Sequence, residues 1–321
     1  MIIICGIIAD EPIRLLCVRL MKMGIEHVFV DQLEYPGCLQ AVQDWGDDNT
    51  IKGRIVFPNG QEVSYEDVTG VYIRHCDFAW PTFLEGFNDL ERGLIMAQRT
   101  MSLSFQFDYL PCVVVNPLRN MVSNDSKPYQ LLAARQAGFS IPRTLVTSEP
   151  DKALAFRDEC GGKIVYKSVS SNRSIVELLD SAAMDKLPLL KNCPVQFQEH
   201  IDGSNVRVHV IGERVFALRI QSAEVDYRYS SHRKIESITL PEAIERRCVA
   251  LSNALGLYFS GIDLLERDGA YYCLEVNPSP GFSFYEVRGQ QPISLALAEF
   301  LKDGKRYYND QISVPREISL V

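Results

Sequence analysis

The sequence predicts an α/β protein whose later part changes to α+β packing. Short β-branched runs alternate along the chain with stretches that have the apolar spacing of helices, which is typical of layered α/β folds. The chain has 321 residues, more than a typical single domain, so two or three lobes are expected. No fixed-period repeat or low-complexity segment is visible, which excludes solenoid and disordered architectures.

An open α/β sheet is expected over the first lobe, residues 1–115. The apolar run at 2–8 predicts a strand, and apolar residues at helical spacing after Pro12 predict a helix that ends at Gly24. A polar stretch that starts at 116 marks the boundary to the next lobe. Further strands of the first lobe are expected at 27–31 (HVFVD), 70–75 (GVYIRH) and 112–116 (CVVVN).

A second lobe is expected at 116–190 and a third at 191–310, with a tail at 311–321. The second lobe continues the alternation of apolar strands with helices. Its elements are expected as a helix at 127–137, a strand at 142–147, a helix at 149–159 and a strand at 163–169.

Antiparallel strands dominate the expected third lobe. Gly212 and Glu213 predict a tight turn between two of these strands, and a helix is expected at 242–255. A hairpin then follows, so this lobe is more β-rich than the others. Its strands are expected at 194–200 (PVQFQEH), 206–211 (VRVHVI), 214–220 (RVFALRI), 259–266 (FSGIDLLE) and 270–277 (AYYCLEVN).

Charge and composition exclude several classes of protein. The formal charge of −8 argues against a nucleic-acid-binding protein. No apolar stretch reaches the ~18–20 residues that a membrane span needs, and the opening MIIICGIIA lacks the basic residues of a signal peptide. The nine cysteines are scattered singly, which indicates reduced thiols and no structural zinc site. A cytoplasmic protein is therefore expected.

The strongest chemical signal is the segment GIDLLERDGAYYCLEVNPSPGF at 261–282. Asp263, Glu275 and Asn277 interrupt strands that are otherwise apolar, and burial of carboxylates is costly unless they are paired or bind a metal. A three-residue loop at 268–270 would place Asp263 opposite Glu275 on one face. A two-residue loop would put Asp263 on the other face, so the metal interpretation depends on the turn.

Two carboxylates and an amide suit a hard cation. Mg²⁺ takes one or two carboxylates together with substrate phosphates, and Mn²⁺ is the alternative ion. For Asp263 alone, a solvent-facing position on an amphipathic hairpin is the better interpretation. All three residues together, followed by Pro-Ser-Pro-Gly, favour a magnesium site.

Several cationic side chains supply candidate anion contacts. Lys127 opens a helix, and Lys167 lies inside an apolar strand from which its ammonium has to reach a cleft or an anion. A surface position is the alternative for either lysine. Arg74 and His75 end an expected strand, where they could bind a substrate carboxylate or simply face solvent.

Polar residues also alternate along the strands on either side of residue 202. Alternation alone indicates a sheet with one wet face, and His209 is expected to be a hydrogen-bonded structural residue rather than a base. Arg219 is expected on the same face, which would then suit a nucleoside triphosphate opposite the acidic hairpin. The pattern comprises Gln196, Gln198, Asn205, Arg207 and His209, with Arg228, Arg233 and Lys234 in the loop beyond Arg219.

Together these motifs resemble the ATP-grasp superfamily, in particular the RimK-like carboxylate–amine ligases and the microviridin-type ribosomal-peptide maturases. The resemblance runs from about Asn116 to Phe284, and its most specific motif is the hairpin at 261–282 combined with the lysine strand. It implies an ATP-grasp fold preceded by an open α/β pre-grasp domain.

The resemblance also implies roles for individual residues. Magnesium would be held by Asp263, Glu275 and Asn277, and the phosphates of ATP by Lys127 and Lys167. The linker that contacts the adenine would be formed by Gln198, Glu199, His200 and Ile201. Asn205 stands where the family usually has an acid that binds the ribose. Arg207 would act at the acyl phosphate, with Arg219 and Arg228 as weaker matches.

The implied activity is an ATP-dependent ligation, in which a carboxylate is activated as an acyl phosphate and joined to an amine or a hydroxyl. The expected partners are ATP and a carboxylate-bearing peptide or amino acid, with a ribosomal precursor peptide as one option and a homo-oligomer left open. A non-catalytic or sensory ATP-binding protein and a kinase-like phosphotransferase are the alternatives. Both lysines and the complete metal trio argue against the non-catalytic alternative.

Overall fold

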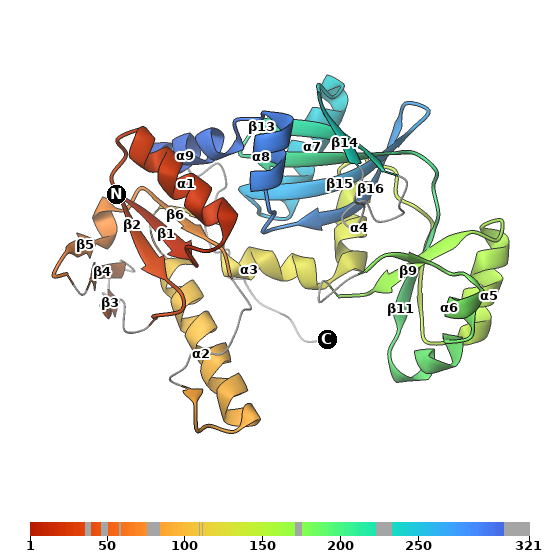
Figure 1. Ribbon diagram of the computed structural model, residues 1–321, viewed down its shortest axis with the longest axis horizontal. Helices are drawn as coiled ribbons and strands as arrows, with labels where there is room; N and C mark the ends of the chain where they lie inside the picture. Colours follow the sequence, from red (N-terminus) through yellow and green to blue (C-terminus); the bar gives the residue numbers. More distant parts are fainter. Residues whose placement is uncertain are drawn as a thin grey trace, which may run out of the picture.

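The computed structural model describes residues 1–35, 40–45, 51–57, 59–75, 84–108, 110, 112–170, 175–222 and 233–304. Within these residues the strands form four sheets, and the chain divides into three lobes that Figure 1 shows in red to orange, green, and cyan to blue. No helix in these described ranges is both long and apolar enough to cross a membrane.

The first lobe contains a parallel sheet in the order β2-β1-β6-β7, as the open α/β prediction requires. A small antiparallel sheet, β3-β4-β5, lies beside it. The sequence analysis did not identify this second sheet or the long helix α2. The elements are β1 (Ile2–Gly6), α1 (Glu11–Lys22), β2 (His27–Asp31), β3 (Gln40–Trp45), β4 (Ile51–Val56), β5 (Glu62–Ser64), β6 (Gly70–Ile73), α2 (Asp89–Asp108) and β7 (Val113–Val115).

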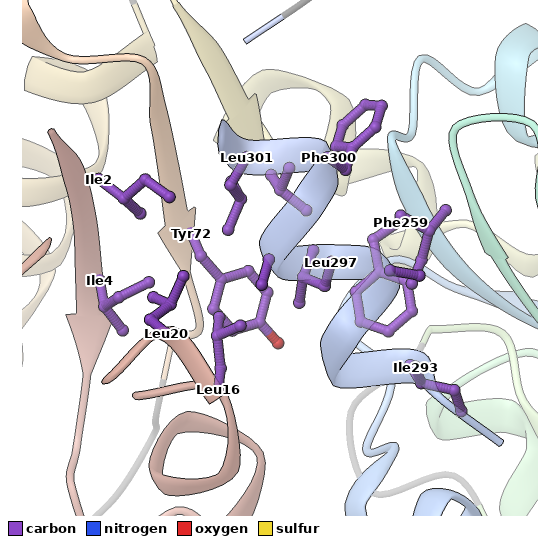
Figure 2. Close-up of a cluster of buried hydrophobic side chains, with 14 of the residues drawn as sticks. Ile2, Ile4, Leu16, Leu20, Tyr72, Phe259, Ile293, Leu297, Phe300 and Leu301 are labelled. Carbon is purple, nitrogen blue, oxygen red and sulfur yellow. The ribbon is translucent and has the colours of Figure 1, made fainter. Parts of the chain in front are cut away.

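The last described helix, α9 (Ile293–Asp303), joins the first lobe to the third. Figure 2 shows α9 between Ile4 and Tyr72 of the parallel sheet on one side and Phe259 on the other. Leu297 of α9 is fully buried in this shared cluster. The N-terminal sheet therefore completes its apolar core with a helix from the other end of the sequence.

The central lobe is an antiparallel sheet in the order β10-β9-β11-β8. The sequence analysis assigned the strand at 194–200 to the third lobe, and this assignment is wrong. That strand pairs with both β8 and β9, and its Phe197 packs into the core of the central lobe. The elements are β8 (Thr144–Thr147), α5 (Pro150–Glu159), β9 (Ile164–Ser168), β10 (Glu177–Leu178), α6 (Ser181–Met184) and β11 (Val195–Glu199).

The third lobe is an antiparallel sheet in the order β14-β13-β12-β15-β16, with the expected turn at Gly212 and Glu213 between β12 and β13. Helices cover it, including α4 from the segment before the central lobe. The elements are α3 (Leu118–Met121), α4 (Lys127–Gln136), β12 (Ser204–Ile211), β13 (Arg214–Ser222), β14 (Arg233–Ile238), α7 (Glu242–Ala254), β15 (Phe259–Arg267), β16 (Ala270–Asn277) and α8 (Ser283–Gly289).

The turn of the β15–β16 hairpin differs from the expected one. The loop has two residues, Asp268 and Gly269, with positive φ angles of 51° and 77°, which is the geometry that Asp-Gly turns favour. A β-bulge then skips Leu274, so that Asp263 still pairs with Glu275. The prediction of a three-residue loop is wrong. The bulge nevertheless restores the predicted pairing of Asp263 with Glu275.

Gln130 fixes α4 against the edge strand β16. Its side-chain amide donates to the carbonyl of Val276 (2.8 Å), and its amide oxygen accepts from the N–H of Val276 (3.0 Å). Gln130 thus acts as a further pairing partner for a strand that lies at the edge of its sheet. The contact holds the helix that begins at Lys127 next to the segment between Glu275 and Asn277.

Candidate functional site

Charged residues from three adjacent strands form a row on one face of the third-lobe sheet. Arg207 of β12 lies opposite Asp263 of β15, which lies opposite Glu275 of β16. Asn277 is two residues beyond Glu275 and is paired with Gly261, so it shares this face. The predicted convergence of the two acids and the amide is therefore present at the level of strand register.

Arg207 lies in a slot formed by its neighbours and is 5% exposed. Its Nη1 donates to Oδ2 of Asp263 at 2.8 Å, and its guanidinium lies 5.7 Å from the centre of the Tyr285 ring. Gly261 forms the floor of the slot, because a Cβ atom at this position would come 2.2 Å from Nη2 of Arg207 and 2.7 Å from Cβ of Pro280. The position of the arginine thus depends on a residue that has no side chain.

Asn277 begins a loop that the first lobe holds in place. Its Oδ1 accepts a hydrogen bond from the N–H of Ser279 (2.8 Å). Arg74 donates from Nη1 to the carbonyls of Ser279 (3.1 Å) and Pro280 (2.9 Å), while its Nε donates to Asp10 (2.6 Å). Arg74 is therefore mostly buried rather than solvent-facing, and it connects the first lobe to the acidic hairpin.

The two lysines lie on either side of the boundary between the central and third lobes. Lys167 of β9 is 4% exposed, and its Nζ donates to the carbonyl of Leu274 (3.3 Å), the residue at the bulge. Burial lowers the pKa of Lys167, and the nearby Lys127 lowers it further, while Glu275 opposes both effects. Lys127 is also buried, and its Nζ donates to the carbonyl of Ser170. Two buried ammonium groups close to a carboxylate form a suitable site for a polyanion with its metal.

The expected adenine linker connects β11 to β12. The amide of Gln198 donates to the Thr144 hydroxyl (3.0 Å), and the N–H of Glu199 donates to the carbonyl of Arg143 (2.9 Å). Burial lowers the pKa of His200, and Ile201 is buried. Asn205 lies two residues before Arg207 in β12, so both side chains are on the same face; Asn205 pairs with Leu265 and Arg207 with Asp263. The linker residues and Asn205 thus occupy a continuous stretch between the two sheets.

His209 is a structural residue rather than a candidate base. It is fully buried, its ring centroid lies 5.0 Å from that of Tyr285 in a tilted arrangement, and its Nε2 lies 3.4 Å from the carbonyl of Gly281. Burial and the nearby Arg207 hold the pKa of His209 well below its usual value. A neutral imidazole is therefore expected beside the arginine.

Arg219 does not lie on the face where the sequence analysis placed it. It pairs with Val206 rather than Arg207, so its side chain is on the opposite face, where it contacts Glu266 at 2.8 Å. The shared-face assignment of Arg219 is wrong. Arg228 lies outside the described residues, as does His232, and so the structure does not place either of them.

The donor set suits magnesium better than a transition metal. Among the residues with described positions, no group of three or more His, Cys, Asp and Glu side chains could hold a metal ion. Asp263 and Glu275 would supply two carboxylates and Asn277 an amide, and Mg²⁺ accepts such oxygen ligands together with phosphates and water. Metals that need several histidine or cysteine ligands do not fit this hairpin.

The sequence analysis missed several residues that shape the candidate site. Gly261 carried a signal, because a glycine inside a strand often marks the close approach of another group. Tyr285 and Gln130 carried no local signal, since each acts through residues far away in the chain.

A RimK-like ATP-grasp domain model matches residues 122–301, more than half of the chain. The chain belongs to the RimK-like ATP-grasp family. Relatives within this family include a probable alpha-L-glutamate ligase of Aliivibrio salmonicida, which is 27% identical over 209 residues and is matched over 61% of this chain and 69% of its own length. A probable alpha-L-glutamate ligase of Psychromonas ingrahamii is 30% identical over 185 residues, 54% of this chain and 61% of its own length.

Solved structures extend the similarity to the first lobe. The macrocyclase MdnC of Microcystis aeruginosa MRC, bound with the precursor peptide MdnA, has a TM-score of 0.79 and 25% identity, covering 94% of this chain and 99% of that one. The ATP-grasp ligase PsnB, complexed with a variant of its minimal precursor, Mg and ADP, has a TM-score of 0.78 and 26% identity, covering 95% and 98%. The ATP-grasp fold of the chain is thereby confirmed, including the lobe that precedes the family domain.

Proposed function

We propose that this chain is an ATP-dependent ligase that activates a carboxylate as an acyl phosphate and joins it to an amine or a hydroxyl. The observation that carries the proposal is the row Arg207, Asp263 and Glu275 on one face, with the buried Lys167 close to Glu275. Acids that can hold a divalent cation thus lie between cations that can hold phosphates. Membership of the RimK-like family supports the same reaction.

The cofactors in this proposal are ATP and Mg²⁺, with Mn²⁺ as the alternative ion. Magnesium would be held by Asp263, Glu275 and Asn277, and it supplies neutralisation of phosphate charge when bound. Lys127 and Lys167 would bind the phosphates. The linker from Gln198 to Ile201 would hold the adenine, and Asn205 the ribose.

Arg207 is the residue that we assign to the reacting carboxylate. A guanidinium fixed beside the metal ligands can stabilise negative charge as it develops on the acyl oxygen. Its slot between Gly261 and Tyr285 holds it in place before substrate arrives. Preorganisation of this kind avoids reorganisation during the reaction.

A peptide substrate is supported by the extent of the structural similarity. MdnC and PsnB, both solved with precursor peptides, align with 94–95% of the chain at TM-scores of 0.79 and 0.78. We propose an acidic peptide as the carboxylate donor, and a cytoplasmic location where ATP is available.

The direct test is incubation of the full chain with Mg-ATP and a library of acidic peptides, with ADP release and peptide mass both recorded. A ligase produces ADP together with peptides that have lost one water, and EDTA abolishes both signals. Phosphorylated peptides without water loss would instead indicate a phosphotransferase. Tight ATP binding without turnover on any peptide would favour the non-catalytic alternative.

Lys167→Met is expected to weaken the binding of Mg-ATP by about 10- to 100-fold, because a charge-assisted hydrogen bond to phosphate contributes about 1.5–3 kcal/mol. Lys163→Met is the matched control, since Lys163 directly precedes β9 but is exposed and contacts Asp202 at 3.1 Å. Isothermal titration calorimetry measures both affinities. Equal affinity in the wild type and Lys167→Met would remove this lysine from the site.

A further inference from the structure

Gln196, in the middle of β11, is a buried polar side chain to which the described part of the chain offers no hydrogen-bond partner. It is 0% exposed, and neither its Nε2 nor its Oε1 has a hydrogen-bond partner among the described residues. Buried side-chain amides in folded proteins almost always have partners, because leaving them unpaired is costly. An unpaired glutamine of this kind points to a ligand that completes its hydrogen bonds.

The register of the central sheet shows which way Gln196 faces. It lies directly opposite Lys167 of β9, and directly opposite side chains of antiparallel strands share a face. The next residue, Phe197, points to the other face and into the core of the central lobe. Gln196 is therefore on the same side as the lysine whose ammonium reaches the carbonyl of Leu274 in the third lobe.

In the central sheet, Gln196 lies between the proposed phosphate contact, Lys167, and the proposed adenine linker. Gln198 follows two residues later on the same face and opens the linker assigned to adenine. Lys167, assigned to phosphate, is the cross-strand neighbour of Gln196. A ligand that spans from Lys167 to the linker would pass over the amide of Gln196.

The hydrogen-bonding groups of the Gln196 amide match the base of a nucleotide better than its phosphates. A primary amide has an N–H donor and a carbonyl acceptor, and both atoms of Gln196 are buried. Phosphate oxygens only accept, so they would leave Oε1 unsatisfied. The N6 amino group and the N7 atom of adenine offer one donor and one acceptor side by side, which is the pair that glutamine binds in a bidentate manner.

We propose that Gln196 is a specificity residue that binds the N6 and N7 edge of adenine and thereby discriminates against guanine nucleotides. Guanine has an acceptor oxygen in place of the N6 donor, so Oε1 of Gln196 would face a second acceptor. This inference rests on the proposed function only in that ATP is the ligand of the site.

The test is calorimetry of Mg-ATP, Mg-7-deaza-ATP and Mg-GTP with the wild type, Gln196→Met and Gln136→Met. Gln136 is an exposed glutamine at the end of α4 and serves as the matched control. Gln196→Met is expected to weaken ATP binding by about 5- to 10-fold, as the loss of one or two hydrogen bonds implies. The wild type and Gln136→Met should prefer ATP to 7-deaza-ATP, whereas Gln196→Met should bind the two equally.

Thermal unfolding of the nucleotide-free proteins separates a binding role from a structural one. Methionine has nearly the shape of glutamine without its unpaired amide, so the Tm of Gln196→Met is expected to rise by about 2–4 °C. A fall in Tm, or an equal loss of affinity for ATP and 7-deaza-ATP, would overturn the inference. If the wild type binds ATP and Gln196→Met shows the same nucleotide selectivity as the wild type, the inference is overturned as well. The proposed function would then remain intact. Absence of ATP binding by the wild type would instead remove the proposed function itself.

Discussion

Asp263→Asn and Glu275→Gln are each expected to reduce ATP turnover by about a thousandfold or more. In the proposed metal site, loss of either carboxylate would weaken the binding of the divalent cation, whose charge neutralisation contributes several kcal/mol to phosphoryl transfer. Both substitutions keep the size of the side chain, and the fold should be retained. Asp263→Asn should also loosen Arg207, because Asp263 is the charge partner of this buried guanidinium.

Glu266→Gln is the matched control for this pair. Glu266 lies on β15, like Asp263, but on the opposite face, where it contacts Arg219. ADP release measured over a range of Mg²⁺ concentrations should remain normal in Glu266→Gln and should be lost in the two site variants. Full turnover in Asp263→Asn, or wild-type turnover in EDTA, would refute the metal assignment.

Gly261→Ala is expected to lower kcat by about a hundredfold while leaving the affinity for Mg-ATP unchanged. The added methyl group would come 2.2 Å from Nη2 of Arg207 and 2.7 Å from Cβ of Pro280, so the guanidinium has to leave its slot. Misplacing one preorganised donor to the reacting oxygen typically costs two to three orders of magnitude, roughly 3–4 kcal/mol.

Gly281→Ala is the control for this prediction, because a Cβ atom at Gly281 would have no neighbour within 4 Å. Turnover with a productive peptide and calorimetry with Mg-ATP would be compared for both variants. A normal kcat in Gly261→Ala would show that the slot does not position Arg207 for the reaction. A parallel loss of ATP affinity would instead indicate that the substitution disturbs the metal ligands.

Local patterns were sufficient for most elements that carry the site. Lys127 begins a helix and Lys167 lies in a buried strand, as periodicity and burial predicted. The pairing of Asp263 with Glu275 was also predicted, but for the wrong reason. The Asp-Gly dipeptide forms the two-residue turn, and no glycine or proline marks the bulge at Leu274 that corrects the register.

The error at Arg219 could have been avoided from the sequence. The turn at Gly212 and Glu213 pairs Ile211 with Arg214, and each further step moves one residue along both strands. Arg219 then comes opposite Val206 and has to face away from Arg207. The predicted turn already contained this information.

Contacts between distant segments could not be predicted. Arg74 binds a loop 205 residues further along the chain, and the position of Tyr285 against Arg207 depends on how α8 packs on the sheet. Neither contact leaves a periodic pattern in the sequence around it. The sheet that strand 195–199 joins could not be predicted either, because its composition suits both neighbouring sheets.

The position of α9 between the first and third lobes affects how the first lobe folds during synthesis on the ribosome. During synthesis β1 leaves the ribosome long before α9, because nearly all the described residues lie between these two elements. Until then, Ile2 and Ile4 have the apolar residues of α1, such as Leu16 and Leu20, but not those of α9. The core of the first lobe is therefore completed only after the third lobe has been synthesised, and its open apolar side has to be kept from aggregation while translation continues.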